Sequence, residues 1–405
     1  MLLIMFRDRL LVFLGLFILI VGVLYPQEKN MIFGIPWTWM PLWFGWATII
    51  CLKLMDPNNT KVSFLYLMSA LTVLFIVFLS SLSVDDYDID LAHLTDVFSV
   101  LILTTLTSFI LLSGVEYSKL LRLTDQFFLI LCFFLLISRI VDNDFSREGS
   151  FLGLGPLTFI KYVSIGLLCR VIHIQKISLS SLALYGFAFV TADSKGPTLF
   201  LIVTYLLFLI VNGKVFSFKK LSVGILMLGF IVTNDRVISF LDEIPYAIEN
   251  FSSITVTNTD VDNNSSGIGN EVSGTLIRIY AISQSLEILS ENLLFGIGPG
   301  QWPVVTGMTS IEYPHNSILE IWSEFGLLVL IIFLYPGWLA VKKIYQRNVY
   351  AYFALFGFMT TLTSGSIRDL RFFILFVLLT FFFSYIHKRS VHYPCNVKKE
   401  VQAHV

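Results

Sequence analysis

One stretch of the chain, residues 274–327, holds residue types that could carry out acid–base chemistry beside a membrane. His315 follows Pro314 and stands just before a long apolar run. A histidine can act as a general base near neutral pH, with Asn316 orienting either the imidazole or the substrate. The plainer alternative is a helix start, in which Asn316 or Ser317 is the N-cap and His315 is merely polar.

Two carboxylates, Glu320 and Glu324, fall within the first turns of the same apolar run. They follow Asn316 at intervals of four residues, so a helix places all three side chains on one face. Carboxylates in a membrane helix are costly unless they face a polar cavity or pair with Arg or Lys. We therefore expect this face to border a functional site.

Arg278 lies on an expected amphipathic helix over residues 275–290. Its guanidinium could clamp a phosphate group, although an arginine at a membrane surface can also extend to lipid headgroups. The glycine-rich turn at 295–300 follows, where Gly298 and Gly300 could let backbone N–H groups approach a ligand or could simply form a turn. No strand precedes this turn, which argues against a nucleotide-binding loop.

Other cations are expected on the outer side of the membrane, as Arg278 is. Several of them lie in short turns next to the end of a predicted transmembrane helix. Each alone could be an exposed loop residue. Several cations converging on one membrane face are what a lipid that carries a pyrophosphate would require. The candidate ligand-binding cations are Arg147, Lys195, Arg236, Arg368 and Arg371.

The composition assigns the chain to a membrane. It has 405 residues, of which 56% are hydrophobic and only 14% charged, and its mean hydropathy is +0.79. A water-soluble core cannot absorb that much apolar surface. The net charge of −1 argues against nucleic acid as a partner. The four cysteines predict no disulfide framework, and His315 has no second His or Cys at a ligand spacing, so we expect no metal site.

Apolar runs predict an all-α polytopic integral membrane protein with about twelve transmembrane helices. Residues 178–212 form either two short helices or one element broken at Ser194–Pro197. The full set of runs is 10–25, 38–54, 62–83, 94–114, 123–141, 157–173, 178–192, 197–212, 220–234, 317–341, 350–365 and 372–387.

The distribution of Lys and Arg predicts the orientation. With the N-terminus in the cytoplasm, about two thirds of the 27 basic residues fall on the inner side. Both termini are then cytoplasmic and the longest polar segment is outside, with a flexible middle at 252–274. The predicted parts are an N-terminal bundle at 1–234, the outer loop at 235–316, C-terminal helices at 317–387 and a cytoplasmic tail at 388–405.

The order of these motifs resembles the O-antigen ligase and polymerase superfamily of bacterial envelope glycosyltransferases. The resemblance rests on R-I-Y-A-I-S-Q-S-L-E-I-L at 278–289, L-F-G-I-G-P-G at 294–300 and H-N-S-I-L-E-I-W-S-E-F-G-L at 315–327. The loop at 147–156 is similar to the first arginine loop of the polymerases. In D-S-K-G-P at 193–197, a lysine stands where the family has an arginine.

The resemblance implies a C-type glycosyltransferase-like fold that needs no metal or cofactor. It implies undecaprenyl-pyrophosphate-linked oligosaccharides as substrates, at the periplasmic face of the bacterial inner membrane. Arg147 and Arg278 would bind pyrophosphate, and His315 would act on the acceptor hydroxyl. A polymerase, working among membrane lipids and with a chain-length regulator, is favoured. A ligase that uses lipid A-core and a flippase for lipid-linked oligosaccharide are the alternatives.

Overall fold

The computed structural model of the chain describes residues 2–21, 31–32, 35–36, 44–49, 104–142, 156–174, 178–192, 195–212, 267–298, 300–307, 314, 316–364 and 367–392. Most of these residues are helical. The helices are α1 (Leu2–Val21), α5 (Thr104–Ser113), α6 (Tyr117–Asp142), α7 (Pro156–Cys169), η4 (Arg170–Ile174), α8 (Leu179–Ala192), α9 (Lys195–Val211), α12 (Gly267–Glu291), α13 (Trp302–Thr306), α14 (Ser317–Lys342), α15 (Val349–Ser364), η6 (Ile367–Leu370) and α16 (Arg371–His392). Residues 44–49 add a short helical stretch.

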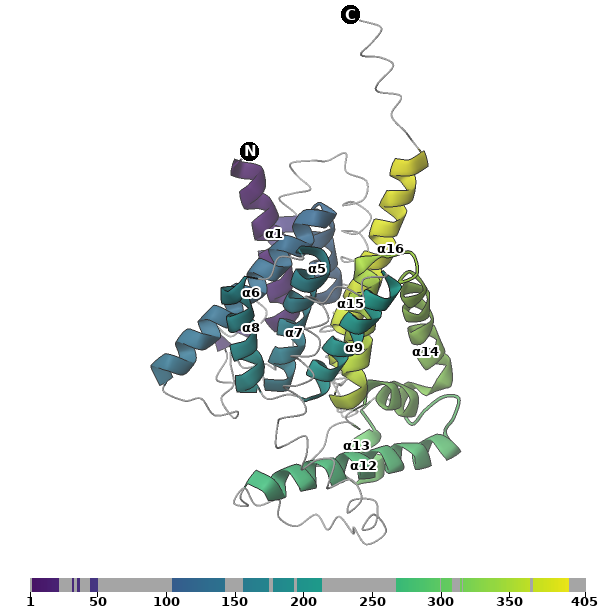
Figure 1. The fold of residues 1–405 in the computed structure, drawn as a ribbon. Helices are drawn as coiled ribbons and strands as arrows, with labels where there is room; N and C mark the ends of the chain where they lie inside the picture. The colour runs from purple at the N-terminus through teal and green to yellow at the C-terminus, as the bar shows by residue number, and fades with distance from the viewer. Residues whose placement is uncertain are drawn as a thin grey trace, which may run out of the picture.

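Most of the helices form a bundle, and one long helix lies across its end. Helices α1, α5, α6, α7, α8, α9, α15 and α16 make up the bundle, with α14 along one side (Figure 1). The start of α1 and the end of α16 lie at the same end of the bundle, and α12 crosses the opposite end with α13 beside it (Figure 1). We call the end covered by α12 the outer end, after the predicted orientation.

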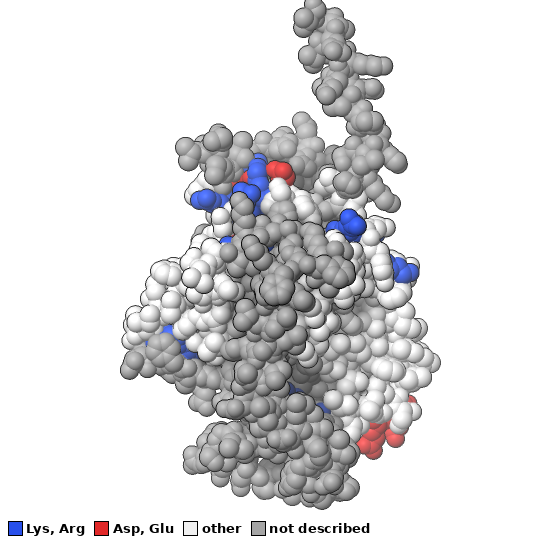
Figure 2. All heavy atoms as spheres, viewed as in Figure 1, with Lys and Arg blue, Asp and Glu red and all other residues white. Residues whose placement is uncertain are grey.

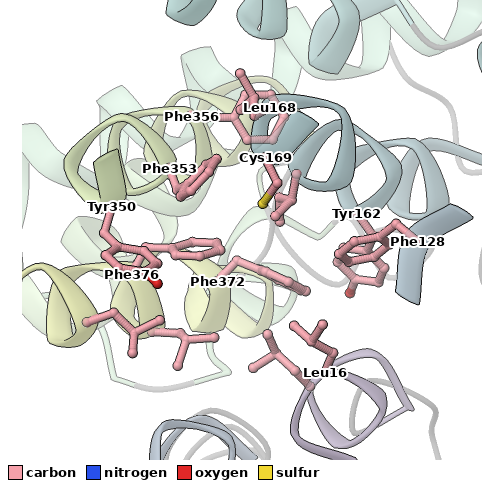
Figure 3. Close-up of a cluster of buried hydrophobic side chains, with 14 of the residues drawn as sticks. Leu16, Phe128, Tyr162, Leu168, Cys169, Tyr350, Phe353, Phe356, Phe372 and Phe376 are labelled. Carbon is pink, nitrogen blue, oxygen red and sulfur yellow. The ribbon is translucent and has the colours of Figure 1, made fainter. Parts of the chain in front are cut away.

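The bundle is held by aromatic and aliphatic side chains from most of its helices. Phe128 of α6, Tyr162 of α7, Phe353 of α15 and Phe372 of α16 point toward a shared interior (Figure 3), and all four are buried. The rings of Phe353 and Phe376 lie 5.1 Å apart, a distance at which aromatic pairs attract. Because lipid is as apolar as these side chains, close packing is what holds such helices together.

Two of the described helices, Tyr117–Val141 and Ser317–Lys342, are long and apolar enough to cross a membrane. Both expose apolar side chains along one face, where water would be unfavourable and lipid would not. On α6 these include Phe133, Phe134 and Ile137, and on α14 they include Ile331 and Ile332. The other apolar helices are shorter, and the expected runs at 62–83 and 220–234 lie outside the described residues.

Charge is unevenly distributed between the two ends of the bundle. On the face in Figure 2, most visible basic side chains lie near the end where α1 begins, and acidic side chains are visible both near that end and at the α12 end. Exposed residues at these ends include Arg7, Lys119 and Lys342 on one side and Glu287 and Glu291 of α12 on the other. The predicted orientation places the end where α1 begins in the cytoplasm.

The structure differs from the sequence expectation at two places and decides between alternatives at a third. α12 begins at Gly267 rather than near 275, because extending a formed helix costs less than starting one, even through glycine and serine. The all-α expectation missed two short strands, β1 (Met31–Ile32) and β2 (Ile35–Pro36), which pair antiparallel. Residues 178–212 form two helices, with Pro197 in the first turn of α9, where proline is tolerated.

A cluster of charged side chains lies at the inner end of α7, where the helix continues into the π-turn η4. The Arg170 guanidinium donates to both oxygens of Asp125, at 2.9 Å from Nε and 2.6 Å from Nη2. The Tyr185 hydroxyl donates to the same carboxylate at 3.0 Å. This arginine therefore has a bidentate partner, which makes the cluster a useful comparison for the cations at the outer end.

Candidate functional site

The start of α14 is fixed by the side chain of Asn316, and both ends of its amide take part. Its Oδ1 accepts from the backbone N–H groups of Ile318 and Leu319 at 3.0 and 3.2 Å. Its Nδ2 donates to the carbonyl oxygen of Leu362, near the end of α15, at 2.9 Å. Asn316 is thus an N-cap, as one of the two sequence alternatives proposed, and it also joins α14 to α15.

Glu320 and Glu324 lie on the Asn316 face of α14, as their spacing predicted, and both are buried. Their residues are 2% and 1% exposed. Burying a carboxylate is expensive unless hydrogen bonds or an opposite charge compensate for the lost hydration. Two such residues in the first turns of a helix at the outer end make this face the acidic side of the candidate site.

Helix α14 is interrupted directly after Glu324. Gly326 has φ 82° and ψ 172°, which is far from helical geometry. Ser323 would normally accept a hydrogen bond from the N–H of Leu327 four residues later. Instead Leu327 donates to the carbonyl oxygen of Leu293 at 3.1 Å, in the turn that follows α12. The break frees backbone groups of α14 to bond with another segment.

Residues 293–298, which include the first part of the glycine-rich turn, form backbone hydrogen bonds with α14 at this break. Ile297 N–H donates to the carbonyl oxygen of Ser323 at 2.8 Å, and Gly298 N–H donates to that of Glu324 at 3.0 Å. The prediction that these N–H groups approach a ligand is therefore wrong at Gly298, because its N–H is occupied by α14. We call the three hydrogen bonds donated by Ile297, Gly298 and Leu327 the turn–helix latch.

Two glycines make the latch possible. Gly296 has φ 70° and Gly326 has φ 82°, in the left-handed region that glycine adopts without strain. A Cβ on Gly326 would collide with the backbone of Leu294 and Phe295, and one on Gly296 would collide with the backbone of Ser323 and Glu324. The Glu-x-Gly of α14 and the first Gly of the G-x-G turn are therefore two halves of one backbone contact.

Trp302 attaches α12 to the same unit. Its side chain is fully buried, and its indole N–H donates to the hydroxyl of Ser285 in α12 at 2.9 Å. Ala281 and Ile288 complete a small apolar cluster around the ring. Arg278 precedes Ser285 by seven residues, about two helical turns, so it lies on the same face of α12. The Arg278 side chain is exposed.

A second set of charged residues joins α7 to the start of α16. Lys161 of α7 donates to Asp369 of η6 at 3.1 Å, and both side chains are largely buried. Arg371, the first residue of α16, is fully buried and donates from Nη2 to the Tyr162 hydroxyl. Its guanidinium carbon lies 5.8 Å from the centre of the Tyr162 ring and 5.9 Å from that of Phe372.

The α15–α16 connection brings these two sets to one end of the bundle. Asn316 is anchored to Leu362 near the end of α15, and Asp369 and Arg371 follow within the next few residues. η6 contacts α14, α15 and α16. The acidic face of α14 and the buried cations of α7 and α16 are therefore neighbours of the same short connection.

The predicted site residues are described to different extents. Arg278, Gly298, Gly300, Asn316, Glu320, Glu324 and Arg371 are described in full. Lys195 begins α9 and Arg368 lies in η6, but only their backbones are described. His315, Arg147 and Arg236 lie outside the described residues. Among the described residues, His, Cys, Asp and Glu form no group of three that could hold a metal ion.

The sequence did not single out Lys161, Tyr162, Asp369, Ser285 or Trp302 as site residues. Pro303 directly after Trp302 was a usable signal, because proline in the first turn marks a helix start. The pairing of Lys161 with Asp369 spans 208 positions of the chain. A local sequence pattern cannot predict a contact between residues so far apart in the chain.

Comparison with known protein families relates the middle of the chain to a family of membrane enzymes. The family model described as O-antigen ligase matches residues 180–334, which include α8, α9, α12, α13 and the first part of α14. The match confirms the resemblance to the O-antigen ligase and polymerase superfamily. Together with the apolar helices, the match is consistent with a membrane protein. No curated protein matches, and no solved structure matches.

Proposed function

Residues 180–334 match the O-antigen ligase family, and on that premise we propose that the chain is a surface-polysaccharide polymerase. It transfers a glycan from undecaprenyl pyrophosphate to the non-reducing end of another lipid-linked repeat unit, at the periplasmic face of the inner membrane. The observation that carries the proposal is the turn–helix latch, because it joins the helix of Arg278 to the helix of Glu320 and Glu324.

The proposed reaction needs a base, cations and no outside cofactor. The acceptor hydroxyl oxygen attacks the anomeric carbon, the carbon–oxygen bond to the pyrophosphate breaks, and undecaprenyl pyrophosphate leaves with the bonding electrons. His315 takes the proton of the attacking hydroxyl. Attack from the side opposite the leaving group inverts the anomeric centre. Cations that neutralise the leaving pyrophosphate replace the metal ion that nucleotide-sugar enzymes often use.

We assign Arg278 and the other outer cations to the pyrophosphate. Arg278 lies about two helical turns before Ser285, on the face of α12 that meets Trp302, and its side chain is exposed. Arg147, Lys195, Arg236, Arg368 and Arg371 are proposed as further cations for the two lipid-linked substrates. A planar guanidinium suits a phosphate better than a lysine does, which gives Arg278 the more specific role.

Asn316, Glu320 and Glu324 take positioning and electrostatic roles in this proposal. The three hydrogen bonds of the Asn316 amide fix the residue that directly follows His315 in the sequence. Glu320, one turn further, stabilises the protonated imidazole, and Glu324 balances the charge of neighbouring cations. Gly298 acts through the latch, and Gly300, with φ 71°, continues the same turn.

The ligase remains the second candidate, because the matching family model carries that description. The loop at 147–156 and the G-I-G-P-G turn favour the polymerase, since both resemble polymerase sequences. The two differ in the acceptor: a polymerase uses a second lipid-linked repeat unit, and a ligase uses lipid A-core.

Reconstitution separates the candidates. The purified chain is placed in liposomes with lipid-linked repeat unit alone, and in parallel with repeat unit plus lipid A-core. Longer lipid-linked glycans in the first sample support the polymerase. Glycan transferred only to lipid A-core would establish the ligase instead. Unchanged glycans that cross the bilayer would establish a flippase and overturn both enzyme proposals.

A further inference from the structure

The junction of α7 and α16 contains a buried arginine, and some of its N–H donors have no hydrogen-bond partner among the described residues. Arg371 is 0% exposed. One of its nitrogens, Nη2, donates to the Tyr162 hydroxyl, whereas Nε and Nη1 have no hydrogen-bond partner among the described residues. A buried charge and its unpaired donors cost free energy that proteins normally avoid. A second anion or acceptor at this place would remove that cost.

The carboxylate closest to Arg371 in the sequence is paired with another cation. Asp369 stands two residues before it, but its Oδ2 accepts from Lys161 at 3.1 Å. Lys161 and Arg371 both lie at this junction, and the Asp369 carboxylate is paired with Lys161. At the other end of α7, the Arg170 guanidinium has both oxygens of Asp125. Arg371, by contrast, has the Tyr162 hydroxyl as its hydrogen-bond partner among the described residues.

Tyr162 adds a donor to the same place. Because its hydroxyl oxygen accepts from Arg371, its own proton remains available to another acceptor. Its ring lies 4.4 Å from that of Phe372, centre to centre, which holds the hydroxyl in position. The junction therefore offers the Tyr162 O–H and the N–H groups on Nε and Nη1 of Arg371. Only an acceptor with several oxygens, such as a phosphate, can use all of them.

The junction lies at the outer end of the bundle. Arg371 is the first residue of α16, and Tyr162 lies six residues after the first residue of α7. At about 1.5 Å per residue, Tyr162 is about 9 Å along α7 from its start. The Asp369 side chain, 14% exposed, is the least buried charged group described here.

We propose that Arg371 and Tyr162 form a phosphate seat for a polyprenyl pyrophosphate, gated by the Asp369–Lys161 ion pair. The proposal rests on the proposed function and adds two residues to it, Tyr162 as a donor and Asp369 as the group that an entering phosphate must displace. Because Arg371 is fully buried, binding requires η6 to move away from α7. A single 3₁₀ turn has weaker hydrogen bonds than an α-helix and can yield first.

Binding of lipid probes to the full chain tests the seat without an activity readout. The chain is placed in phosphatidylcholine nanodiscs, and native mass spectrometry titrates undecaprenyl pyrophosphate, undecaprenol and phosphatidylglycerol. Tyr162→Phe should weaken binding of undecaprenyl pyrophosphate about tenfold, which is the usual cost of losing a hydrogen bond to a charged group. Tyr185→Phe, which removes a hydroxyl at the Asp125 cluster, is the matched control and should bind normally.

The Asp369→Asn variant should bind undecaprenyl pyrophosphate more tightly than the wild type, whereas Tyr162→Phe should bind it more weakly. It removes the competing carboxylate and leaves Lys161 and Arg371 to the phosphate, so affinity should rise. A merely structural ion pair would give equal or weaker binding, together with a lower melting temperature, and that result overturns the proposal. Equal binding of undecaprenyl pyrophosphate by the wild type and Tyr162→Phe also overturns it.

The remaining outcomes separate the lipid sources and the two proposals. Binding of undecaprenol as tight as that of its pyrophosphate would exclude a phosphate seat. Displacement by equimolar phosphatidylglycerol would assign the seat to ordinary anionic lipid and contradict the pyrophosphate assignment. If the wild type elongates glycans in liposomes but Tyr162→Phe and Asp369→Asn bind as it does, the seat fails and the polymerase stands. Binding with the expected variant pattern but without elongation supports the seat and overturns the polymerase.

Discussion

The backbone N–H of Gly298 donates a hydrogen bond to the carbonyl oxygen of Glu324 at 3.0 Å. This bond joins the turn after α12 to the break in α14. Both segments are short and contain glycine. The helix of Arg278 and the helix of Glu320 and Glu324 are then joined by the backbone bonds of the latch, together with the Trp302–Ser285 contact. The distance between the two halves of the site consequently depends on residues that do no chemistry.

Gly326→Ala should abolish polymer formation and lower the melting temperature. Alanine at φ 82° is strained by about 1 kcal/mol or more, and its Cβ would collide with the backbone of Leu294 and Phe295. Gly307→Ala is the matched control, since Gly307 has φ 68° but nothing within 4 Å of the added Cβ. Polymer length on gels and thermal unfolding measure the two effects. Wild-type polymer from Gly326→Ala would show that the latch is dispensable.

Trp302→Phe should loosen α12 and shorten the polymer without unfolding the bundle. Phenylalanine keeps most of the apolar contact but loses the N–H that donates to Ser285, a loss of about 1 kcal/mol. Hydrogen exchange of α12 should increase, whereas that of α15 and α16 should not. Trp338→Phe, at a residue 58% exposed, is the control. Unchanged exchange in α12 would contradict the docking role of Trp302.

Asn316→Asp should retain more activity than Asn316→Ala. Aspartate still caps the N–H groups of Ile318 and Leu319, while alanine removes the cap at a cost of about 1 kcal/mol. Both variants lose the donor to Leu362. If Asn316 only positions α14, both variants should lower kcat with little change in KM for the repeat unit. A selective rise in KM would instead indicate direct sugar binding by the amide.

Arg278→Lys should reduce polymerisation at least about tenfold, because a lysine keeps the charge but lacks the planar donor set. The initial rate of glycan elongation in liposomes is the measurement. Arg122→Lys, an exposed arginine of α6 near the opposite end, serves as control. Full activity of the Arg278 variant would mean that this arginine only anchors α12 at the membrane surface.

The helices that follow from apolar periodicity were predictable, and the contacts between them were not. The Asn-Ser pair at 316–317 predicted the start of α14, and the apolar run predicted its end within two residues. The break at Gly326 gave no signal, because the apolar pattern continues through it and one glycine is tolerated in many helices. The Lys161–Asp369 and Arg371–Tyr162 pairs depend on tertiary packing alone.

The first turns of α12, at residues 267–274, also differ from what local sequence composition predicts. Residues 267–274 contain three glycines, an asparagine and a serine, which favour a loop by local propensity. Yet Ile268, Val272 and Leu276 recur every four residues, a helical interval. The composition suggested the wrong state here, and the spacing of the few apolar residues suggested the right one.

The role of His315 as the base is tested by glycan elongation with His315→Ala, in liposomes that contain only lipid-linked repeat unit. His392→Ala, at the last residue of α16, is the control for loss of a histidine. We expect normal expression and folding of both variants, normal elongation by the control, and no product longer than one repeat from His315→Ala. Near-normal chains from His315→Ala would contradict the assignment of His315 as the base and, with it, the proposed site.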